Sequence, residues 1–147
     1  MKLPAHAAAS AALSGAVFAA TGSATMAVAA TLSGIFIDLD HLADFLILSG
    51  EKFSIRAFFR WCEDMKWERI FLLLHSFELW SLAALLAFWL RNELLIGLTL
   101  GAAGHLILDQ IGNRNLKNGR LCAWFYFLSY RCRVGFRRAL LVHDPVA

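Results

Sequence analysis

Eight ionisable residues lie within or at the ends of strongly apolar stretches of this 147-residue chain. They are His6, Asp38, Asp40, His41, His75, Glu78, His105 and Asp109. In a membrane segment each such side chain costs roughly 2.5 kcal/mol or more, so eight of them need a shared explanation. Imidazoles and carboxylates are ligands that divalent metals bind in proteins. The residue types therefore predict a metal site.

The spacing of these residues fits a common cluster of ligands. His75 and Glu78 are three residues apart, and His105 and Asp109 are four apart. On a helix, either spacing places two side chains on one face. Eight candidates exceed the four ligands of one tetrahedral ion. We therefore expect one to three divalent ions, with zinc as the first candidate and Mn or Mg as alternatives.

Each residue also has an ordinary structural interpretation. A single histidine in a helix is more often a hydrogen-bonded core residue than a ligand. Asp38 or Asp40 alone could end a helix, and Glu78 could pair with Arg69. We interpret His143, near the end of the chain, as a surface residue. The joint occurrence of the other residues is what favours metal binding.

Four apolar runs must position these residues. They span residues 4–20, 24–37, 70–90 and 94–111. Hydrophobic residues make up 59% of the chain, against about 45–50% in soluble domains, and the mean hydropathy is +0.59. Polar breaks at 21–23 and 91–93 predict turns, and hence two antiparallel helical hairpins. We expect a single all-α domain over residues 1–147, a polytopic membrane protein, although 4–37 could instead form one long helix.

Counting residues from the two turns brings the polar groups to one level. His6 and Asp38 each lie sixteen residues from the middle of the first turn, and His75 and Asp109 each lie seventeen from the middle of the second. At about 1.5 Å per residue, all four lie roughly 24–26 Å from their turns. Two antiparallel hairpins would therefore gather the candidate ligands near one membrane surface.

Two segments mix aromatic with basic residues. Residues 53–67 predict an amphipathic helix on the membrane surface, with a solvated helix as the alternative. The tail from residue 114 has five aromatic residues between 124 and 130 and seven Lys or Arg residues, which suits the lipid headgroup layer. The three cysteines lack CxxC spacing and are interpreted as reduced and structural. The Ala-rich start could alternatively be a secretory signal, but its cleavage would discard His6.

The basic residues are distributed unevenly between the two sides of the expected membrane domain. With both turns on one side, thirteen of the fourteen Lys and Arg residues fall on the other, and only Arg91 lies with the turns. Basic residues favour the cytoplasmic side of a membrane protein. This distribution predicts a multi-pass protein with both termini in the cytoplasm.

At the candidate ligands the sequence resembles the membrane-bound metal-dependent hydrolase family of bacterial inner membranes. The matching pieces follow the same order between residues 5 and 113: His6, Asp38-Leu39-Asp40-His41, His75-Ser76 and His105-Leu106-Ile107-Leu108-Asp109. Ile37 stands where the family has proline, and Ile70-Phe71 where it has a His-Arg pair, for which Glu78 is the candidate substitute. More distantly, the order of ligands is similar to that of the all-helical zinc-dependent phospholipase C group.

The resemblance implies a metal-dependent hydrolase of the bacterial inner membrane that cleaves a phosphate ester. The expected substrate is a lipid or polyprenyl phosphate, with its head at the cytoplasmic surface and its tail among membrane lipids. The residues expected at the centre of the reaction are Asp38, Asp40, His75 and Asp109. The residues expected to bind phosphoryl oxygens are Arg69, Lys66 and Arg114, with lipid-headgroup contact as their alternative role.

Two other functions fit the same residues. Buried histidines and carboxylates also line metal or proton pathways in transporters. A transporter needs polar groups at several depths, however, whereas the counting places these at one level. The other alternative is a non-catalytic membrane scaffold with a structural metal site. Nucleic acid is not an expected partner, and the pattern does not predict an oligomeric state.

Overall fold

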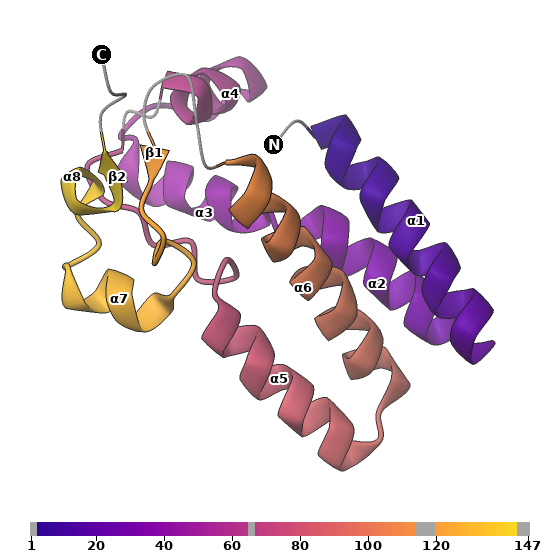
Figure 1. The fold of residues 1–147 in the computed structure, drawn as a ribbon. Helices are drawn as coiled ribbons and strands as arrows, with labels where there is room; N and C mark the ends of the chain where they lie inside the picture. The colour runs from indigo at the N-terminus through magenta and orange to yellow at the C-terminus, as the bar shows by residue number, and fades with distance from the viewer. Residues whose placement is uncertain (1–2, 65–66, 114–119, 144–147) are drawn as a thin grey trace.

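The computed structural model describes residues 3–64, 67–113 and 120–143 of the chain. Its elements are α1 (Leu3–Thr21), α2 (Ala24–Phe36), α3 (Leu39–Leu48), α4 (Ile55–Asp64), α5 (Phe77–Leu90), α6 (Glu93–Gly112), β1 (Arg120–Leu121), α7 (Leu128–Arg133), α8 (Arg138–Leu141) and β2 (Val142–His143). The fold is mostly helical, as predicted (Figure 1). The predicted all-α class is consistent with this structure, which adds one short antiparallel ribbon in which β1 pairs with β2.

The two predicted turns end their helices by ordinary capping chemistry. Gly22 adopts a left-handed φ of 68°, and the Ser23 side chain accepts a hydrogen bond from the amide of Met26 at the start of α2. Asn92 caps α6 in the same way. The Ser23 hydroxyl also donates to the Glu93 carboxylate at 2.7 Å. The two turns therefore lie side by side, and the antiparallel hairpins are confirmed.

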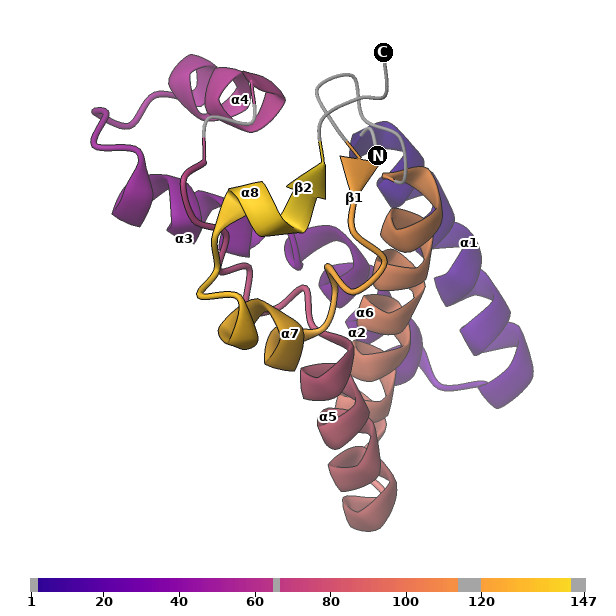
Figure 2. The same cartoon turned by 60° about the vertical axis from the view of Figure 1, so that its left-hand side comes forward.

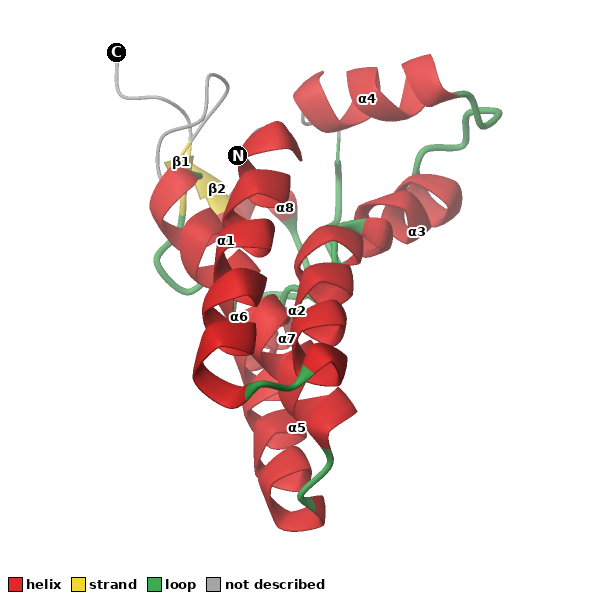
Figure 3. Ribbon diagram, turned by 90° about the vertical axis from the view of Figure 1, so that its right-hand side faces the viewer, coloured by secondary structure: helices red, strands yellow, loops and turns green. Residues whose placement is uncertain are grey.

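Figure 3 shows α1, α2 and α6 stacked together with α5 below them, while α3 leads away from the stack toward α4. The beginning of α1, α4 and the β1–β2 ribbon all lie at the end of the molecule opposite the two turns (Figures 1 and 2). This is the end at which the counted positions of the polar residues predict the cluster.

Helices α2 and α6 approach each other closely because glycine lines their contact. A Cβ atom at Gly101 would overlap the carbonyl oxygen of Ala30 and the hydroxyl of Ser33. A Cβ atom at Gly97 would lie 2.7 Å from that of Ala29. The backbones can pack at this distance only without side chains at these positions, which fixes α6 relative to the first hairpin.

Replacing Gly101 with alanine is therefore expected to destabilise the protein. The overlap with Ala30 forces the two helices apart, and overpacking of this kind costs about 1–3 kcal/mol. The Gly15→Ala variant is the matched control, because a Cβ atom there would meet nothing within 4 Å on the exposed side of α1. Thermal unfolding of the purified variants in detergent measures the difference. An unfolding temperature of Gly101→Ala equal to that of Gly15→Ala would contradict the packing argument.

The third apolar run is helical only in its second part. Helix α5 begins at Phe77, and residues 70–76 form a loop in which Leu72 has a left-handed φ of 41°. The amides of Phe71 and Leu72 donate to the Asp44 carboxylate at 2.8 and 3.2 Å. These bonds satisfy the backbone outside a helix, which the apolar sequence pattern does not reveal.

Two helical stretches, 24–48 and 93–112, are long and apolar enough to cross a membrane. Helix α5 is shorter but presents large apolar side chains outward, with Phe88 82% and Trp89 78% exposed. Within the predicted amphipathic segment, α4 packs Trp61 against Phe45 of α3 and leaves Ile55 exposed.

The tail packs on the bundle instead of lying wholly in a headgroup layer. Its Phe125, Tyr126 and Leu141 are buried in one core with Ile37 of the first hairpin and Leu106 of α6. Arg131, which the aromatic and basic pattern assigns to lipid headgroups, is completely buried. That prediction is wrong for this residue, because its guanidinium binds backbone carbonyl groups inside the protein.

Candidate metal centre

Four of the predicted ligands meet at the end of the bundle. Asp38 lies at the junction of α2 and α3, His75 at the end of the 70–76 loop, and His105 and Asp109 one turn apart on α6. One ligand atom from each residue lies within 4.8 Å of those of the other three. We call these four residues the metal cluster. The predicted convergence of separate helices is confirmed for them.

The separations between the carboxylate oxygens and the imidazole nitrogens are compatible with a bound metal ion. Asp38 Oδ1 lies 3.3 Å from His75 Nε2 and 3.3 Å from His105 Nε2. Asp109 Oδ2 lies 3.6 and 3.5 Å from the same two nitrogens. Ligand atoms bound at 2.0–2.2 Å around a tetrahedral ion are about 3.3–3.6 Å apart.

The nearest polar neighbours of the two imidazole Nε2 atoms are the carboxylates of the cluster itself. Both Nε2 atoms are buried, and within the described part of the chain neither makes a hydrogen bond of good geometry, because the carboxylate oxygens lie at ion-pair distances of 3.3–3.6 Å. A bound cation would satisfy buried nitrogens that lack a well-formed hydrogen bond. The mixed imidazole and carboxylate donor set fits a divalent ion such as Zn²⁺.

The opposite nitrogen of each imidazole is held by a second group. His75 Nδ1 lies 3.0 Å from both oxygens of Asp40, and His105 Nδ1 lies 2.8 Å from the carbonyl oxygen of Gly34. Such bonds fix the ring orientation and the tautomer, so that Nε2 faces the other ligand atoms of the cluster. Asp40, predicted as a ligand, therefore has the geometry of a group that orients His75.

His6 and His41 lie beside the metal cluster. His6 Nε2 is 3.0 Å from Asp109 Oδ1, and the His6 ring stacks on that of His105 at 4.0 Å between centroids. His41 forms a second possible ligand group with Asp40 and His75. Both residues are near enough to the cluster to add ligands or to orient its carboxylates.

Glu78 has a different position from the other predicted ligands. Its carboxylate accepts hydrogen bonds from the amides of Leu128 and Ser129 at 2.8 and 3.0 Å and from the Ser129 hydroxyl at 2.7 Å. It thus binds the start of α7, and it belongs to neither possible ligand group among the described residues. The spacing argument assumed that His75 and Glu78 share a helix, but His75 precedes the Ser76 cap of α5.

Asp44 and Arg131, which the sequence did not single out, help Asp40 to hold the loop of His75 in place. Asp44 accepts hydrogen bonds from the amides of Phe71 and Leu72, and Asp40 accepts them from the amides of Leu74 and His75. From the other side, Arg131 donates to the carbonyl oxygens of Leu72 at 2.8 Å and His75 at 2.9 Å. The spacing of four between Asp40 and Asp44 could have indicated that they share a helix face. No comparable signal separates Arg131 from the other tail arginines.

The charge of His75 depends on its acidic neighbours. Burial alone lowers the pKa of this imidazole, but the carboxylates of Asp109, Asp38 and Asp40 outweigh burial and raise the pKa well above its usual range. The three carboxylates therefore favour the protonated form of His75. A metal ion that bound there would compete with a proton for the imidazole.

Of the predicted phosphate-binding residues, only Arg69 lies in the described part of the chain, and it lies away from the metal cluster. Lys66 and Arg114 lie outside the described residues. Arg69 is exposed and lines a hollow with Trp61, Trp67 and other residues, none of which belongs to the metal cluster.

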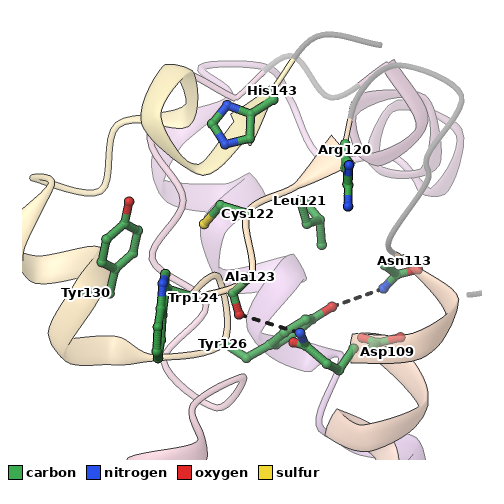
Figure 4. Close-up of a pocket in the computed structure, with 11 residues that line it drawn as sticks. Asp109, Asn113, Arg120, Leu121, Cys122, Ala123, Trp124, Tyr126, Tyr130 and His143 are labelled. Atoms are coloured by element: carbon green, nitrogen blue, oxygen red, sulfur yellow. Dashed lines mark hydrogen bonds between the residues drawn. The ribbon is translucent and has the colours of Figure 1, made fainter. Parts of the chain in front are cut away.

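A different hollow, of about 460 Å³, opens beside the metal cluster (Figure 4). Asp109 contributes to its wall together with residues of the α6 end, the β1–β2 ribbon and the segment before α7. Figure 4 shows Asp109 and Tyr126 on one side of this hollow and Arg120 and His143 on another. The centre is therefore adjacent to a space that a ligand can enter.

No protein-family model, curated protein or solved structure matches this chain. The geometry of its own residues therefore carries the functional argument.

Proposed function

We propose that the protein is a membrane-embedded, metal-dependent hydrolase that cleaves a phosphate ester at the cytoplasmic membrane surface, a divergent relative of the bacterial inner-membrane hydrolases that its motifs resemble. The single observation that carries this proposal is the convergence of four ligand atoms, two carboxylate oxygens and two buried imidazole nitrogens, with carboxylate-to-imidazole separations of 3.3–3.6 Å. A bound divalent ion would supply a water of lowered pKa and positive charge facing the phosphoryl oxygens.

Neighbouring groups hold the ligands of the cluster in position. Asp40 and the Gly34 carbonyl group hold the two imidazoles, and His6 holds one oxygen of Asp109. The Asp38 side chain is 33% exposed, whereas the other three ligands are at most 5% exposed. Solvent would reach a bound ion from the Asp38 side, and the remaining ligands would be shielded from it.

The membrane placement rests on apolar surface and on charge. The two apolar helical stretches and the outward-facing aromatic side chains of α5 suit contact with lipid. The proposed orientation puts the paired turns outside and the metal cluster near the inner leaflet. Thirteen of the fourteen basic residues then lie on the cytoplasmic side.

A structural metal site is the second candidate, because four protein ligands can saturate a tetrahedral zinc ion. The partial exposure of Asp38 favours catalysis, because a carboxylate at the solvent edge could give up its coordination position to water or substrate, whereas the ligands of a structural site stay closed around the ion.

Replacing Asp38 with alanine is expected to abolish hydrolysis while leaving the protein in the membrane. Loss of a residue that only orients a ligand costs 10–100-fold in activity, and loss of a ligand costs at least about a hundredfold. The assay measures phosphate release from phosphatidic acid and from a polyprenyl phosphate, with and without EDTA. Glu51→Ala, which removes an exposed ion pair with Arg60, is the control and should keep full activity.

EDTA-sensitive release by the wild type that is lost in Asp38→Ala supports the hydrolase. Unchanged release in Asp38→Ala contradicts it. Stoichiometric zinc without hydrolysis of either substrate favours the structural site.

A further inference from the structure

We infer that the hollow beside the metal cluster binds the phosphate group of an amphiphilic ligand through Arg120 and His143. This inference deepens the proposed function and rests on it, because the metal cluster forms part of the wall of the hollow. Neither residue belongs to the set predicted from the sequence to bind phosphate.

The β1–β2 ribbon places the two side chains together. Arg120 and His143 are direct partners in its antiparallel register, so their side chains leave the ribbon on the same face. Both line the hollow, as Figure 4 shows. A guanidinium and an imidazole opposite each other form a set of hydrogen-bond donors suited to phosphate oxygens.

The rest of the wall favours an anion over a cation. Among the described residues that line the hollow, Asp109 is the only carboxylate. Its Oδ1 atom faces His6 and its Oδ2 atom faces the cluster imidazoles, so its charge is directed at those groups. With a divalent ion bound by the cluster, positive charge would stand on both sides of the space.

The remaining wall and the rim suit an attached apolar group. Trp124, Tyr126 and Tyr130 line the hollow, and Trp124 is 58% exposed at its edge. Gln110 of α6 approaches the carbonyl oxygen of Ala123 at 3.5 Å, and the next residue on the helix, Ile111, is 69% exposed. A volume of about 460 Å³ exceeds that of a phosphate ion and lies within the usual range for ligand sites.

The test is equilibrium binding by the full chain in detergent, carried out on zinc-loaded and zinc-free protein. The two probes are inorganic phosphate and dihexanoyl phosphatidic acid, each titrated by calorimetry. Arg120→Gln and His143→Gln should each weaken binding about tenfold, the typical cost of losing one charge-assisted hydrogen bond. Arg133→Gln is the matched control, because this residue is also exposed in the tail but does not line the hollow.

Loss of affinity in Arg120→Gln and His143→Gln, but not in Arg133→Gln, supports the inference. Tighter binding of the lipid than of inorganic phosphate would identify a lipid headgroup as the source, and equal binding a free phosphate. Wild-type protein that binds neither probe, or variants that bind as tightly as the wild type, overturn the inference. Zinc content measured on the same samples distinguishes the metal centre from the phosphate site. Protein that binds no zinc contradicts the metal centre, whereas zinc-bound protein that binds no phosphate contradicts only the site in the hollow.

Discussion

Zinc is expected to stabilise the folded protein by about 4 kcal/mol when its free concentration is a thousand times the dissociation constant. The four donors come from three separate parts of the chain, so the unfolded protein cannot present them together. Without the ion, the two buried imidazole Nε2 atoms have only the ion-pair contacts with Asp38 and Asp109, at 3.3–3.6 Å. Thermal unfolding of purified protein in detergent, with zinc and with EDTA, measures the effect.

Two variants compare a cluster ligand, His105, with Glu78, which the sequence predicted to be a ligand but which lies outside the cluster. His105→Gln removes one Nε2 donor, so both the bound zinc and the zinc-dependent rise in unfolding temperature should disappear. Glu78→Gln should still bind zinc, because its carboxylate caps α7 at a distance from the cluster. Its loss should lower stability by about 1 kcal/mol, as for other helix caps. Zinc binding by His105→Gln, or its loss in Glu78→Gln, would contradict the assignment.

The convergence of Asp38, His105 and Asp109 could be predicted because it depends largely on regular helix geometry, whereas the place of His75 depends on its loop. A helix rises by a constant amount per residue, and the capped turns at Gly22 and Asn92 fix where the counting starts. Small residues such as Gly101 then bring the helices close enough for ligand atoms to meet. The sequence predicted how far His105 and Asp109 lie from the second turn and that they share a helix face, because both properties depend on one helix alone.

The parts that were not predicted depend on hydrogen bonds between distant segments. The apolar run from residue 70 has the composition of a helix. Its first part is nevertheless a loop, because the amides of Phe71 and Leu72 donate hydrogen bonds to Asp44 instead of to a helical backbone. Once His75 lies before the helix, the spacing to Glu78 no longer describes a shared face. Composition likewise could not distinguish the buried Arg131 from exposed arginines such as Arg133, because only the folded tail decides which one turns inward.

The same dependence on distant segments makes Arg131 a sensitive position outside the cluster. Arg131→Met is expected to destabilise the protein by about 3–6 kcal/mol, because it removes two buried hydrogen bonds from a charged group, each contributing about 1.5–3 kcal/mol. The substitution leaves the carbonyl groups of Leu72 and His75 without donors. It also removes the positive charge that faces Asp40, Glu78 and Asp44. Zinc affinity should fall 10–100-fold as well, because the bond to His75 holds a ligand in place.

Arg133→Met, on the same helix but exposed, controls for loss of positive charge and should change stability by less than about 0.5 kcal/mol. Arg131→Lys tests geometry separately from charge. A lysine keeps the charge opposite the buried carboxylates but cannot reproduce the planar fork that reaches two carbonyl groups. It should therefore recover part of the stability while zinc affinity stays low. If Arg131→Met unfolds at the same temperature and binds zinc as tightly as Arg133→Met, the tail does not position His75, and the metal cluster is held by the helical bundle and Asp40 alone.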